Sequence, residues 1–497
     1  MWKKISRDEV KKLGHRLVQT KWVFCKKVEA DGKIRAKSRI VSKGFMQIPG
    51  VDYLESFSPV ARDCSVRIAF GLALHLGWNI DMIDVEAAFL NGELKTRMFL
   101  EWPEGLVELG FLTDEEARTT CIDLQKSMYG NVDAALLWQE TIRKFFLKIG
   151  LKQSCADPCI YYKRVGDNMC LLVVVYVDDM LFAGPTSEIA WCKEQLSSEY
   201  KINDLGSLKK HLGIHYHWNT NSSVERMLVA NMDGMANEIV EKYKKVTGRY
   251  PVGSNTPGIP GKSLAKNQGE TIMLEDYRSI VGKVMYYTTK IAPECSNAAR
   301  ELVQHMSNPG NEHWIAMERM CGYIKAKGKH EIVYCRPKEL KVICFADSDY
   351  AKNSDDCCSV SGHVTTLGGM ITTWVSKTQN SVTLSSTEAE YVSLASCAQE
   401  VIFMQMLLDE VWHCKKPGLI YEDNTGAIFL VKNAQVGLRT KHIDIRHHFI
   451  RELWQKGLIN VEYIKSEDNV ADVLTKNVTV DLFGKLVPGL LSGMIIG

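Results

Sequence analysis

The feature that most constrains this chain is a run of seven apolar residues, Leu171 to Val177, closed by two adjacent aspartates, Asp178 and Asp179. Seven residues fall far short of the roughly 18–20 that a membrane-spanning helix needs. Residues 170–184 are therefore expected to form two strands joined by a polar turn inside a core. Because burying an unpaired carboxylate costs free energy, the doublet should be paired, hydrogen-bonded or metal-bound. The alternative is a simple polar turn tip.

The rest of the chain predicts a mixture of helices and strands. Two alternating segments, 20–28 and 34–43, flank Asp31-Gly32, the pattern of a β-hairpin. We further expect helices at 66–76 and 138–150, a strand at 79–85, a Pro/Gly-rich linker at 250–275 and helical hairpins at 277–327. From Leu340 a compact α/β domain is expected, with strands at 342–345, 361–375, 419–421 and 460–464 and helices at 387–411, 426–431, 447–456 and 470–475.

Several further carboxylates lie where strands or helices are expected to end. Asp84 lies at the end of the strand at 79–85. A tight turn at residues 178 and 179 would let the side chains of Asp178 and Asp179 point toward one metal ion. Asp84 could equally be a strand-end cap. In the second half the candidates are Asp347, Glu388, Asp423 and Asp472. The spacing of Glu388 from Ser385 also fits a capping box, and Asp472 could complement a helix dipole. Nearby acids read as ordinary loop residues: Asp349, Asp355, Asp356 and Asp468.

Charge and cysteine content bound the environment of the protein. The formal net charge is +2, but residues 1–50 hold fourteen Lys or Arg against four Asp or Glu. Such a basic segment suits either a polyanion-binding face or a solvated surface. The fifteen cysteines include no CxxC pair, so reduced thiols are expected. Without a leader at Met1 to Lys12, we expect an intracellular protein that does not bind membranes.

Several motifs, taken in order, resemble the copia type of long-terminal-repeat retrotransposon polyprotein. Tyr176 to Met180 resembles the YVDD signature of reverse transcriptases. The other matching segments of the first two thirds are 21–24, 39–47, 57–62, 88–92, 277–286 and 306–314. Segments 346–350, 384–391, 422–424, 439–446 and 471–476 are similar to that family's ribonuclease H. Residues 130–137 differ from the turn that many relatives have, and the nucleocapsid, protease and integrase of a full polyprotein are missing.

This resemblance implies an α+β right-hand polymerase of fingers, palm and thumb, then a helical connection and an α/β RNase H-like domain. The expected domains are residues 1–255 for the reverse transcriptase, 256–339 for the linker and connection, 340–476 for the RNase H-like domain and 477–497 for a C-terminal tail. The implied partners are an RNA template, a DNA primer, an RNA–DNA hybrid, deoxynucleoside triphosphates and other retrotransposon proteins. The expected location is cytoplasmic, in virus-like particles, or nuclear.

Site roles follow from the same resemblance. Asp84, Asp178 and Asp179 would hold two Mg²⁺, or Mn²⁺, at the polymerase site. Arg39, with Lys37 and Lys43 nearby, would meet the incoming triphosphate. Phe89 would exclude a ribose 2′-hydroxyl, unless it is a plain core residue. A second pair of ions would be held by Asp347, Glu388, Asp423 and Asp472.

Two other functions stay open at this point. One is a catalytically inactive remnant that only binds nucleic acid, which the basic amino-terminal segment and the missing partner domains favour. The other is an unrelated nuclease in which only the last domain is active. Magnesium-dependent primer extension distinguishes the reverse transcriptase implied by the resemblance from both of these alternatives.

Overall fold

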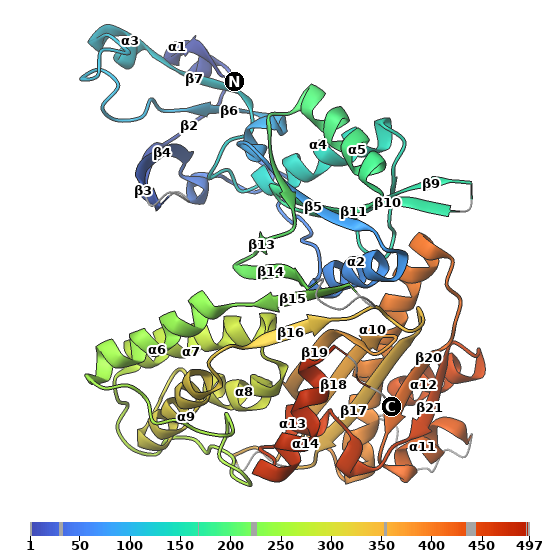
Figure 1. Ribbon diagram of the computed structural model, residues 1–497. Helices are drawn as coiled ribbons and strands as arrows, with labels where there is room; N and C mark the ends of the chain where they lie inside the picture. Colours follow the sequence, from blue (N-terminus) through green and yellow to red (C-terminus); the bar gives the residue numbers. More distant parts are fainter. Residues whose placement is uncertain are drawn as a thin grey trace. The chain divides into compact units, whose positions relative to one another are not determined.

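The computed structural model of the protein describes residues 2–28, 33–166, 168–219, 226–351, 355–433, 444–493 and 495 (Figure 1). The chain divides into two compact units. Unit 1 comprises Met1–Ala61 and Asp81–Gly206, and unit 2 comprises Arg62–Ile80 and Ser207–Gly497. The domain boundaries expected at residues 255, 339 and 476 do not coincide with the boundaries of these two compact units. The expected division into functional domains stays a prediction.

Unit 1 is built on three sheets. A six-stranded sheet has the order β12-β5-β11-β10-β9-β8, a four-stranded sheet has the order β1-β7-β6-β2, and β3 pairs with β4 alone. The strands are β1 Trp2–Ser6, β2 Leu17–Val18, β3 Thr20–Val28, β4 Ile34–Ser42, β5 Asn79–Val85, β6 Glu93–Leu100, β7 Thr120–Lys126, β8 Lys152–Gln153, β9 Ile160–Val165, β10 Asn168–Tyr176, β11 Asp179–Gly184 and β12 Ile202–Ser207. The helices are α1 Arg7–Lys12, α3 Asp114–Thr119, α4 Ala134–Lys148 and α5 Thr186–Glu199, with short 3₁₀ turns at Gly44–Met46 and Ala88–Asn91.

The core of unit 1 lies between the six-stranded sheet and its helices. Leu171, Val173 and Val175 alternate along β10, so their side chains share one face of the sheet, and all three are buried. Trp138 and Phe146 of α4 belong to the same buried cluster. This packing fixes β5, β10 and β11, the strands from which the first candidate site is built.

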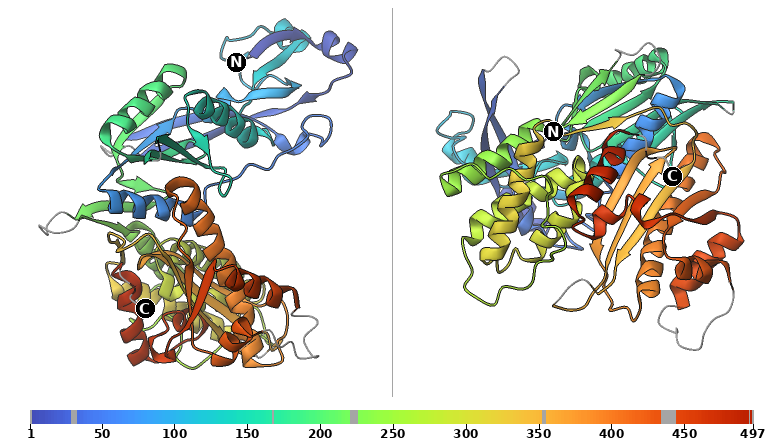
Figure 2. Two further views of the ribbon diagram at one scale, coloured as in Figure 1. Left: turned by 90° about the vertical axis from the view of Figure 1, so that its right-hand side faces the viewer. Right: turned by 60° about the horizontal axis from the view of Figure 1, so that its bottom comes forward.

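The first part of unit 2 combines a small sheet with helices. The strands β13 Lys210–His211, β14 Ile214–Asn219, β15 Met227–Asn231 and β16 Glu331–Tyr334 form a sheet in that order. The helices are α2 Asp63–Leu76, α6 Asp233–Thr247, α7 Leu274–Lys290, α8 Ser296–Gln304 and α9 Asn311–Lys327, with a 3₁₀ turn at Pro293–Cys295. Figure 2 shows α6 to α9, in green and yellow, gathered beside the orange strands of the same unit.

The last part of unit 2 is a five-stranded sheet in the order β19-β18-β17-β20-β21. Its strands are β17 Val342–Asp349, β18 Val360–Leu367, β19 Met370–Thr378, β20 Gly418–Glu422 and β21 Ile459–Tyr463. The first three pair antiparallel, whereas β20 pairs parallel with both β17 and β21. The helices are α10 Ser386–Trp412, α11 Thr425–Lys432, α12 Asp444–Gln455, α13 Asp472–Thr475 and α14 Val480–Leu491, with a 3₁₀ turn at Ser466–Asp468.

Helix α10 is the central helix of this last part. Among the described residues it is the one helix long and apolar enough to cross a membrane by length and composition, although 56% of its most apolar window is buried inside the protein. It packs against β17, β18 and β20. Its apolar character therefore has a structural explanation in the core of the five-stranded sheet.

Most of the expected elements are confirmed. The hairpin of residues 20–43 forms as β3 and β4 in register from Thr20–Ser42 to Val28–Ile34, and the hairpin of residues 170–184 forms as β10 and β11. Residues 250–273 carry no helix or strand, as the linker prediction requires. The Asp31-Gly32 turn and residues 439–443 of the RNase H motif lie outside the described residues. The expected C-terminal tail contains helix α14.

Two candidate metal-binding carboxylate sets

The first set comprises Asp84, Asp178 and Asp179, which we call the hairpin carboxylates. Tyr176 pairs with Asp179, so Val177 and Asp178 are the two central residues of the β10–β11 turn. Val177 has φ 59°, a left-handed conformation that β-branched residues rarely adopt and that costs about 1–3 kcal/mol. Glycine is the usual residue at such a turn position. The surrounding structure must therefore hold this turn in place.

Two hydrogen bonds do so. The indole nitrogen of Trp138 donates to the carbonyl oxygen of Val177 over 2.6 Å. The backbone N–H of Val85 donates to the carbonyl oxygen of Asp178 over 2.9 Å. Because Val85 directly follows Asp84, the second bond brings Asp84 to the aspartate doublet although some ninety residues separate them in the chain. The structure thus places the three predicted carboxylates where β5, β10 and β11 meet, in the interior strands of the six-stranded sheet.

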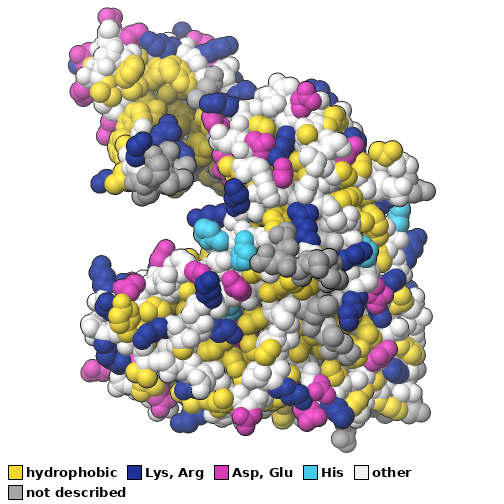
Figure 3. Space-filling model, in the orientation of Figure 1, with side chains coloured by type: hydrophobic (Ala, Val, Ile, Leu, Met, Phe, Trp, Pro, Cys, Tyr) yellow, Lys and Arg dark blue, Asp and Glu magenta, His cyan; other side chains and the backbone are white. Residues whose placement is uncertain are grey.

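Two of the three hairpin carboxylates border a large cavity of about 920 Å³ in unit 1. Asp84 and Asp178 line it together with Arg35, Lys37 and Arg39 of β4. Figure 3 shows Lys and Arg side chains on the β3–β4 hairpin beside apolar ones. A cavity with carboxylates and cationic side chains in its wall can hold metal ions and a polyphosphate together.

The cavity changes the ionisation of the doublet. Partial desolvation of the carboxylate raises the pKa of Asp178, and the charge of Asp84 adds to this. Burial, followed by the charges of Asp178 and Asp84, raises the pKa of Asp179 to about 6. The amide of Asn203 donates to a carboxylate oxygen of Asp84 over 3.1 Å. Mutual repulsion of this kind is what a bound divalent cation relieves.

Two of the three predicted triphosphate-binding residues line the cavity. Arg39 lies over the ring of Tyr129, with its guanidinium carbon 5.3 Å from the ring centroid. Lys37 also lines the cavity. Lys43 is absent from the described residues that line the cavity. Its ammonium group donates to the side-chain oxygen of Gln19 over 2.8 Å. Lys37 and Arg39 therefore share the cavity with the hairpin carboxylates, and Lys43 does not.

Phe89 is half-buried behind the cavity wall. It is absent from the described residues that line the cavity, but its ring packs edge-on against Tyr129, which does line it, with 5.3 Å between centroids. Phe89 therefore contacts a residue of the cavity wall. The expected role of Phe89 in excluding a 2′-hydroxyl stays a prediction.

Residues 130–137 depart from the pattern of many relatives, and their first part is a loop that precedes α4 and supports the end of β4. The backbone N–H of Ser42 donates to Tyr129, and the Ser42 hydroxyl donates to the side-chain oxygen of Asn131 over 2.6 Å. A Cβ at Gly130 would lie 2.2 Å from the Ser42 carbonyl oxygen, and Gly130 has φ 93°, so only glycine fits. This loop positions the strand that carries Lys37 and Arg39.

The second set lies in the five-stranded sheet of unit 2 and comprises five residues, which we call the sheet carboxylates: Asp347, Glu390, Glu422, Asp423 and Asp472. Oxygens of Asp347, Asp423 and Asp472 lie within 4.8 Å of one another. Oxygens of Glu390, Glu422 and Asp423 do the same, so Asp423 belongs to both groups. Three of the four residues predicted here, Asp347, Asp423 and Asp472, are thus brought together.

The prediction of Glu388 as the glutamate of this site does not match the geometry. Glu388 is absent from both groups among the described residues. Its carboxylate accepts the backbone N–H of Leu384 over 2.8 Å, and its own N–H donates to the Ser385 hydroxyl over 3.2 Å. The structure therefore shows the Ser385 N-cap bond of the capping-box alternative, while the Glu388 carboxylate binds the residue before the N-cap. Glu390 lies inside the site instead. It follows Glu388 by two residues, and two residues along an α-helix turn the side-chain direction by about 200°.

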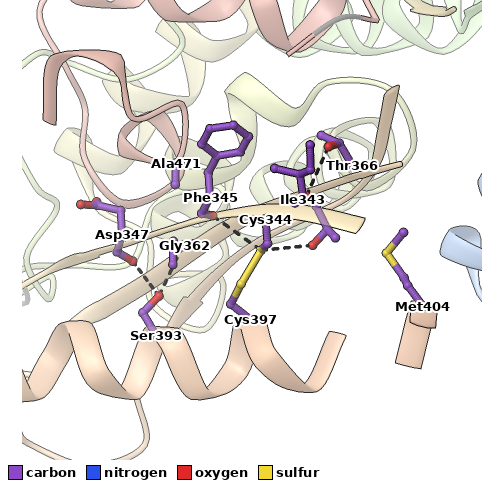
Figure 4. Close-up of a disulfide and its surroundings, with 12 residues drawn as sticks. Ile343, Cys344, Phe345, Asp347, Gly362, Thr366, Ser393, Cys397, Met404 and Ala471 are labelled. Atoms are coloured by element: carbon purple, nitrogen blue, oxygen red, sulfur yellow. Dashed lines mark hydrogen bonds between the residues drawn. A yellow bond between two sulfur atoms is a disulfide. The ribbon is translucent and has the colours of Figure 1, made fainter. Parts of the chain in front are cut away.

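Asp347 is held in the middle of the sheet. It is 1% exposed, and the Ser393 hydroxyl of α10 donates to its backbone carbonyl over 2.8 Å (Figure 4). The Thr475 hydroxyl donates to its carboxylate. Its cross-strand partner is Gly362, where a Cβ would lie 2.6 Å from Thr475, so glycine lets α13 approach the sheet. This close approach brings Asp472 to Asp347.

A disulfide between Cys344 of β17 and Cys397 of α10 joins the same two elements (Figure 4). Cys344 precedes Asp347 by three residues, and Cys397 follows Glu390 by two helical turns. The expectation that all thiols are reduced is wrong for this pair. The cross-link fixes the strand that carries Asp347 against the helix that carries Glu390.

Burial dominates the electrostatics of the sheet carboxylates. Burial, followed by neighbouring carboxylate charges, raises the pKa of Glu390 to about 11. Burial also raises the pKa of Asp347, Glu422 and Asp472. One cation offsets part of this charge: the Lys476 ammonium lies 3.0 Å from Asp472 and 3.5 Å from Asp347. Although burial opposes it, these two carboxylates raise the pKa of Lys476.

Both sets offer only oxygen atoms, the ligands that Mg²⁺ and Mn²⁺ prefer. The two sets differ in how closely their carboxylates approach one another. Among the described residues, three carboxylate oxygens within 4.8 Å of one another occur only in the sheet set. Sequence reasoning missed Glu390, Glu422 and Lys476. For Glu390 a signal existed, since it shares the spacing of the buried α10 residues Leu394, Cys397 and Val401.

Comparisons with known proteins decide the family. Residues 8–259, just over half of the chain, match the family described as reverse transcriptase (RNA-dependent DNA polymerase). The chain belongs to the reverse transcriptase family. It is 32% identical over 479 residues to the retrovirus-related Pol polyprotein from transposon TNT 1-94 of Nicotiana tabacum, covering 95% of this chain and 35% of that protein. It is 33% identical over 464 residues to the corresponding polyprotein from transposon RE1 of Arabidopsis thaliana, covering 93% of this chain and 31% of that protein.

These relatives confirm the resemblance to copia-type polyproteins. This reverse transcriptase chain spans about a third of the length of the curated relatives it matches. Among solved structures it is similar to the foamy viral protease-reverse transcriptase in complex with an RNA/DNA hybrid, with a TM-score of 0.47 and 13% identity, covering 89% of this chain and 50% of that one.

Proposed function

We propose that this chain is a retrotransposon reverse transcriptase, an RNA- and DNA-directed DNA polymerase, that also cleaves RNA in RNA–DNA hybrids. The observation that carries the proposal is the presence of two separate carboxylate sets, one beside a cavity with cationic walls and one inside an α/β sheet. In this proposal the hairpin carboxylates lie in the palm, the β3–β4 hairpin belongs to the fingers, and the elements from β13 to α6 belong to the thumb.

At the polymerase site, Asp84, Asp178 and Asp179 would hold two Mg²⁺ or Mn²⁺ ions. When bound, such ions activate the attacking hydroxyl and neutralise charge on the leaving pyrophosphate. Arg39 and Lys37 bind the triphosphate, with Arg39 oriented by Tyr129. Asn203 orients the Asp84 carboxylate. The remaining work is positioning of the primer and the nucleotide.

At the hybrid-cleavage site, Asp347, Glu390, Asp423 and Asp472 would hold the ions, with Glu390 in place of the expected Glu388. Ser393 and Thr475 orient Asp347, and Lys476 balances charge before cations arrive. Cleavage at this site would require hybrid recognition by backbone shape and 2′-hydroxyls. The expected partners and the cytoplasmic, particle-associated or nuclear location belong to the same proposal.

Primer extension on an RNA template with Mg²⁺ tests the polymerase half. The double variant Asp178→Asn/Asp179→Asn should lose extension by about 10³-fold, more than the loss of a single preorganised donor causes, and keep hybrid cleavage. Glu194→Gln, on an exposed face of α5, is the matched control for loss of acidic charge. Asp347→Asn should show the reverse pattern.

An inactive remnant would behave differently. It would bind hybrids with strong salt dependence and show no turnover at either site. Hybrid cleavage without any extension by the folded wild-type chain would instead support the nuclease alternative.

A further inference from the structure

Glu422 is a buried acid with an incomplete set of partners. It is 0% exposed and ends strand β20. One carboxylate oxygen accepts the backbone N–H of Asn424 over 3.0 Å. The other oxygen, Oε2, is buried and has no hydrogen-bond partner among the described residues. Such a group is costly in a core unless something else binds it.

The strand directs Glu422 toward helix α10. Side chains alternate along β20, so Gly418, Ile420 and Glu422 share one face. A Cβ at Gly418 would lie 2.3 Å from the side chain of Val401, which places this face against α10. Glu390 lies on the same helix, is 7% exposed, and also has a buried oxygen without a hydrogen-bond partner in the described part of the chain.

The two glutamates therefore face a common point. Their oxygens lie within 4.8 Å of each other and of Asp423, which is shared with the group of Asp347 and Asp472. The cation of this region, Lys476, pairs with Asp347 and Asp472. No ion pair to Glu390 or Glu422 occurs among the described residues. The Glu390–Glu422 side thus offers carboxyl oxygens without a protein cation against them.

We propose that Glu422 is a fifth carboxylate ligand of the hybrid-cleavage site, binding one divalent cation together with Glu390 and Asp423. Asp423 then bridges this cation and a second one held by Asp347 and Asp472. The geometry suits a pair of ions about 3.5–4 Å apart that share one carboxylate. This inference rests on the proposed hybrid-cleavage function and assigns a ligand that is not among the site residues predicted from the sequence.

Direct counting of bound Mn²⁺ by electron paramagnetic resonance tests the proposal on the full chain. Asp178→Asn/Asp179→Asn serves as the background, which removes binding at the hairpin carboxylates. In that background we expect two Mn²⁺ per chain. Glu422→Gln, which removes charge and keeps shape, should lose one ion or weaken its binding at least about tenfold. Glu462→Gln on the neighbouring strand β21 is exposed and should change nothing.

The outcomes separate this proposal from the one on which it rests. If Glu422→Gln binds both ions with unchanged affinity while Asp347→Asn does not, Glu422 is no ligand, and the two glutamates simply share a proton. If neither Asp347→Asn nor Glu422→Gln alters Mn²⁺ binding, the hybrid-cleavage site itself is refuted.

Thermal unfolding supplies a second measurement. Replacing a buried carboxyl group that lacks one hydrogen-bond partner should raise the unfolding temperature of the metal-free Glu422→Gln variant and reduce the further rise that Mg²⁺ causes in the parent chain. A variant with an unchanged Mg²⁺-dependent rise contradicts the proposal. Glu422→Asp, which keeps the charge on a shorter side chain, should retain both ions with weaker binding of one. If Glu422→Gln does not fold, Glu422→Asp decides the question, and unchanged affinity in it contradicts the proposal.

Discussion

The hairpin carboxylates and the sheet carboxylates bring acids together in opposite ways. Asp178 lies on an exposed turn, and the set borders a cavity with cationic side chains in its wall. The sheet set is mostly buried, with Asp347 at 1% and Glu422 at 0% exposure, and its oxygens form two groups of three, each within 4.8 Å and sharing Asp423. The first set is open to a large ligand, whereas the second is assembled before any ligand arrives.

This difference shows where each site stores unfavourable free energy. In the hairpin set it lies in the backbone, at Val177 with its positive φ. In the sheet set it lies in buried charge, which a single lysine and any bound cations must offset. Substitutions should therefore have effects of different kinds in the two regions.

The largest expected effect separates Glu388 from Glu390, two glutamates in the first turns of α10. Glu390→Gln should lower hybrid cleavage at least about 100-fold, because a direct ligand matters more than the outer partners of a metal site, whose loss costs about 10–100-fold. Glu388→Gln should leave the rate within about threefold of the parent, since its carboxylate serves only to cap the helix. Rates on a labelled hybrid measure both. Equal losses in the two variants would contradict the assignment of Glu390.

The next effect concerns pH at the hairpin set. The pKa of Asp179 is raised to about 6, so its protonated form, which cannot bind metal, appears as the pH falls through 6. Mn²⁺ affinity at this set should therefore fall by up to about tenfold per pH unit below 6. The stability effect has the opposite sign, because a raised pKa in the folded protein favours folding at low pH and is lost as the pH rises through 6.

Mn²⁺ titrations at pH 5 and 7.5, in an Asp347→Asn background, measure this dependence. Asp179→Asn should remove most of it. A pH dependence that persists unchanged in Asp179→Asn would assign the titration to another group.

A smaller effect should distinguish the cations near the cavity. Arg39→Ala should raise the KM for deoxynucleoside triphosphates by about tenfold or more, as expected for loss of a charge-assisted hydrogen bond to phosphate. Lys43→Ala removes the same charge from a side chain bonded to Gln19 and should change KM by less than about twofold. Steady-state primer extension gives both values. Similar effects would show that net charge, rather than position, controls binding.

The smallest effect is on stability alone. Ser385→Ala removes the N-cap of α10 and should lower the free energy of unfolding by about 1 kcal/mol. Ser386→Ala, one residue later, makes no cap bond and is the control. Thermal unfolding with hybrid cleavage as a parallel assay should show a stability change without a matching loss of rate.

Elements with strong local patterns could be predicted from the sequence. The hairpin strands β3 and β4, β10 and β11, and helix α2 all have clear periodicity or turn residues. The meeting of Asp84 with the doublet followed from motif resemblance and is explained by the hydrogen bond from Val85 to Asp178. Local pattern alone could not supply this long-range pairing.

The differences from expectation occur where tertiary packing selects between neighbouring residues. Glu388 and Glu390 stand two positions apart, and only the face of α10 that packs on the sheet decides which enters the site. Lys43 follows the last residue of β4, so strand alternation no longer predicts its direction. Cys344 and Cys397 are 53 residues apart, and no spacing rule indicates that they pair.

Helix α2 belongs to unit 2 although residues of unit 1 flank it on both sides in the sequence. Its buried Arg67 donates to the carbonyl oxygen of Thr372 over 2.8 Å and lies over the ring of Trp374. A polypeptide that began at Ser207 would expose this binding surface and lack the helix that covers it. Proteolysis after Gly206 would leave α2 attached to unit 2 by non-covalent contacts alone. Separating the two proposed activities on independent polypeptides therefore requires supplying residues 62–80 to the second one as well.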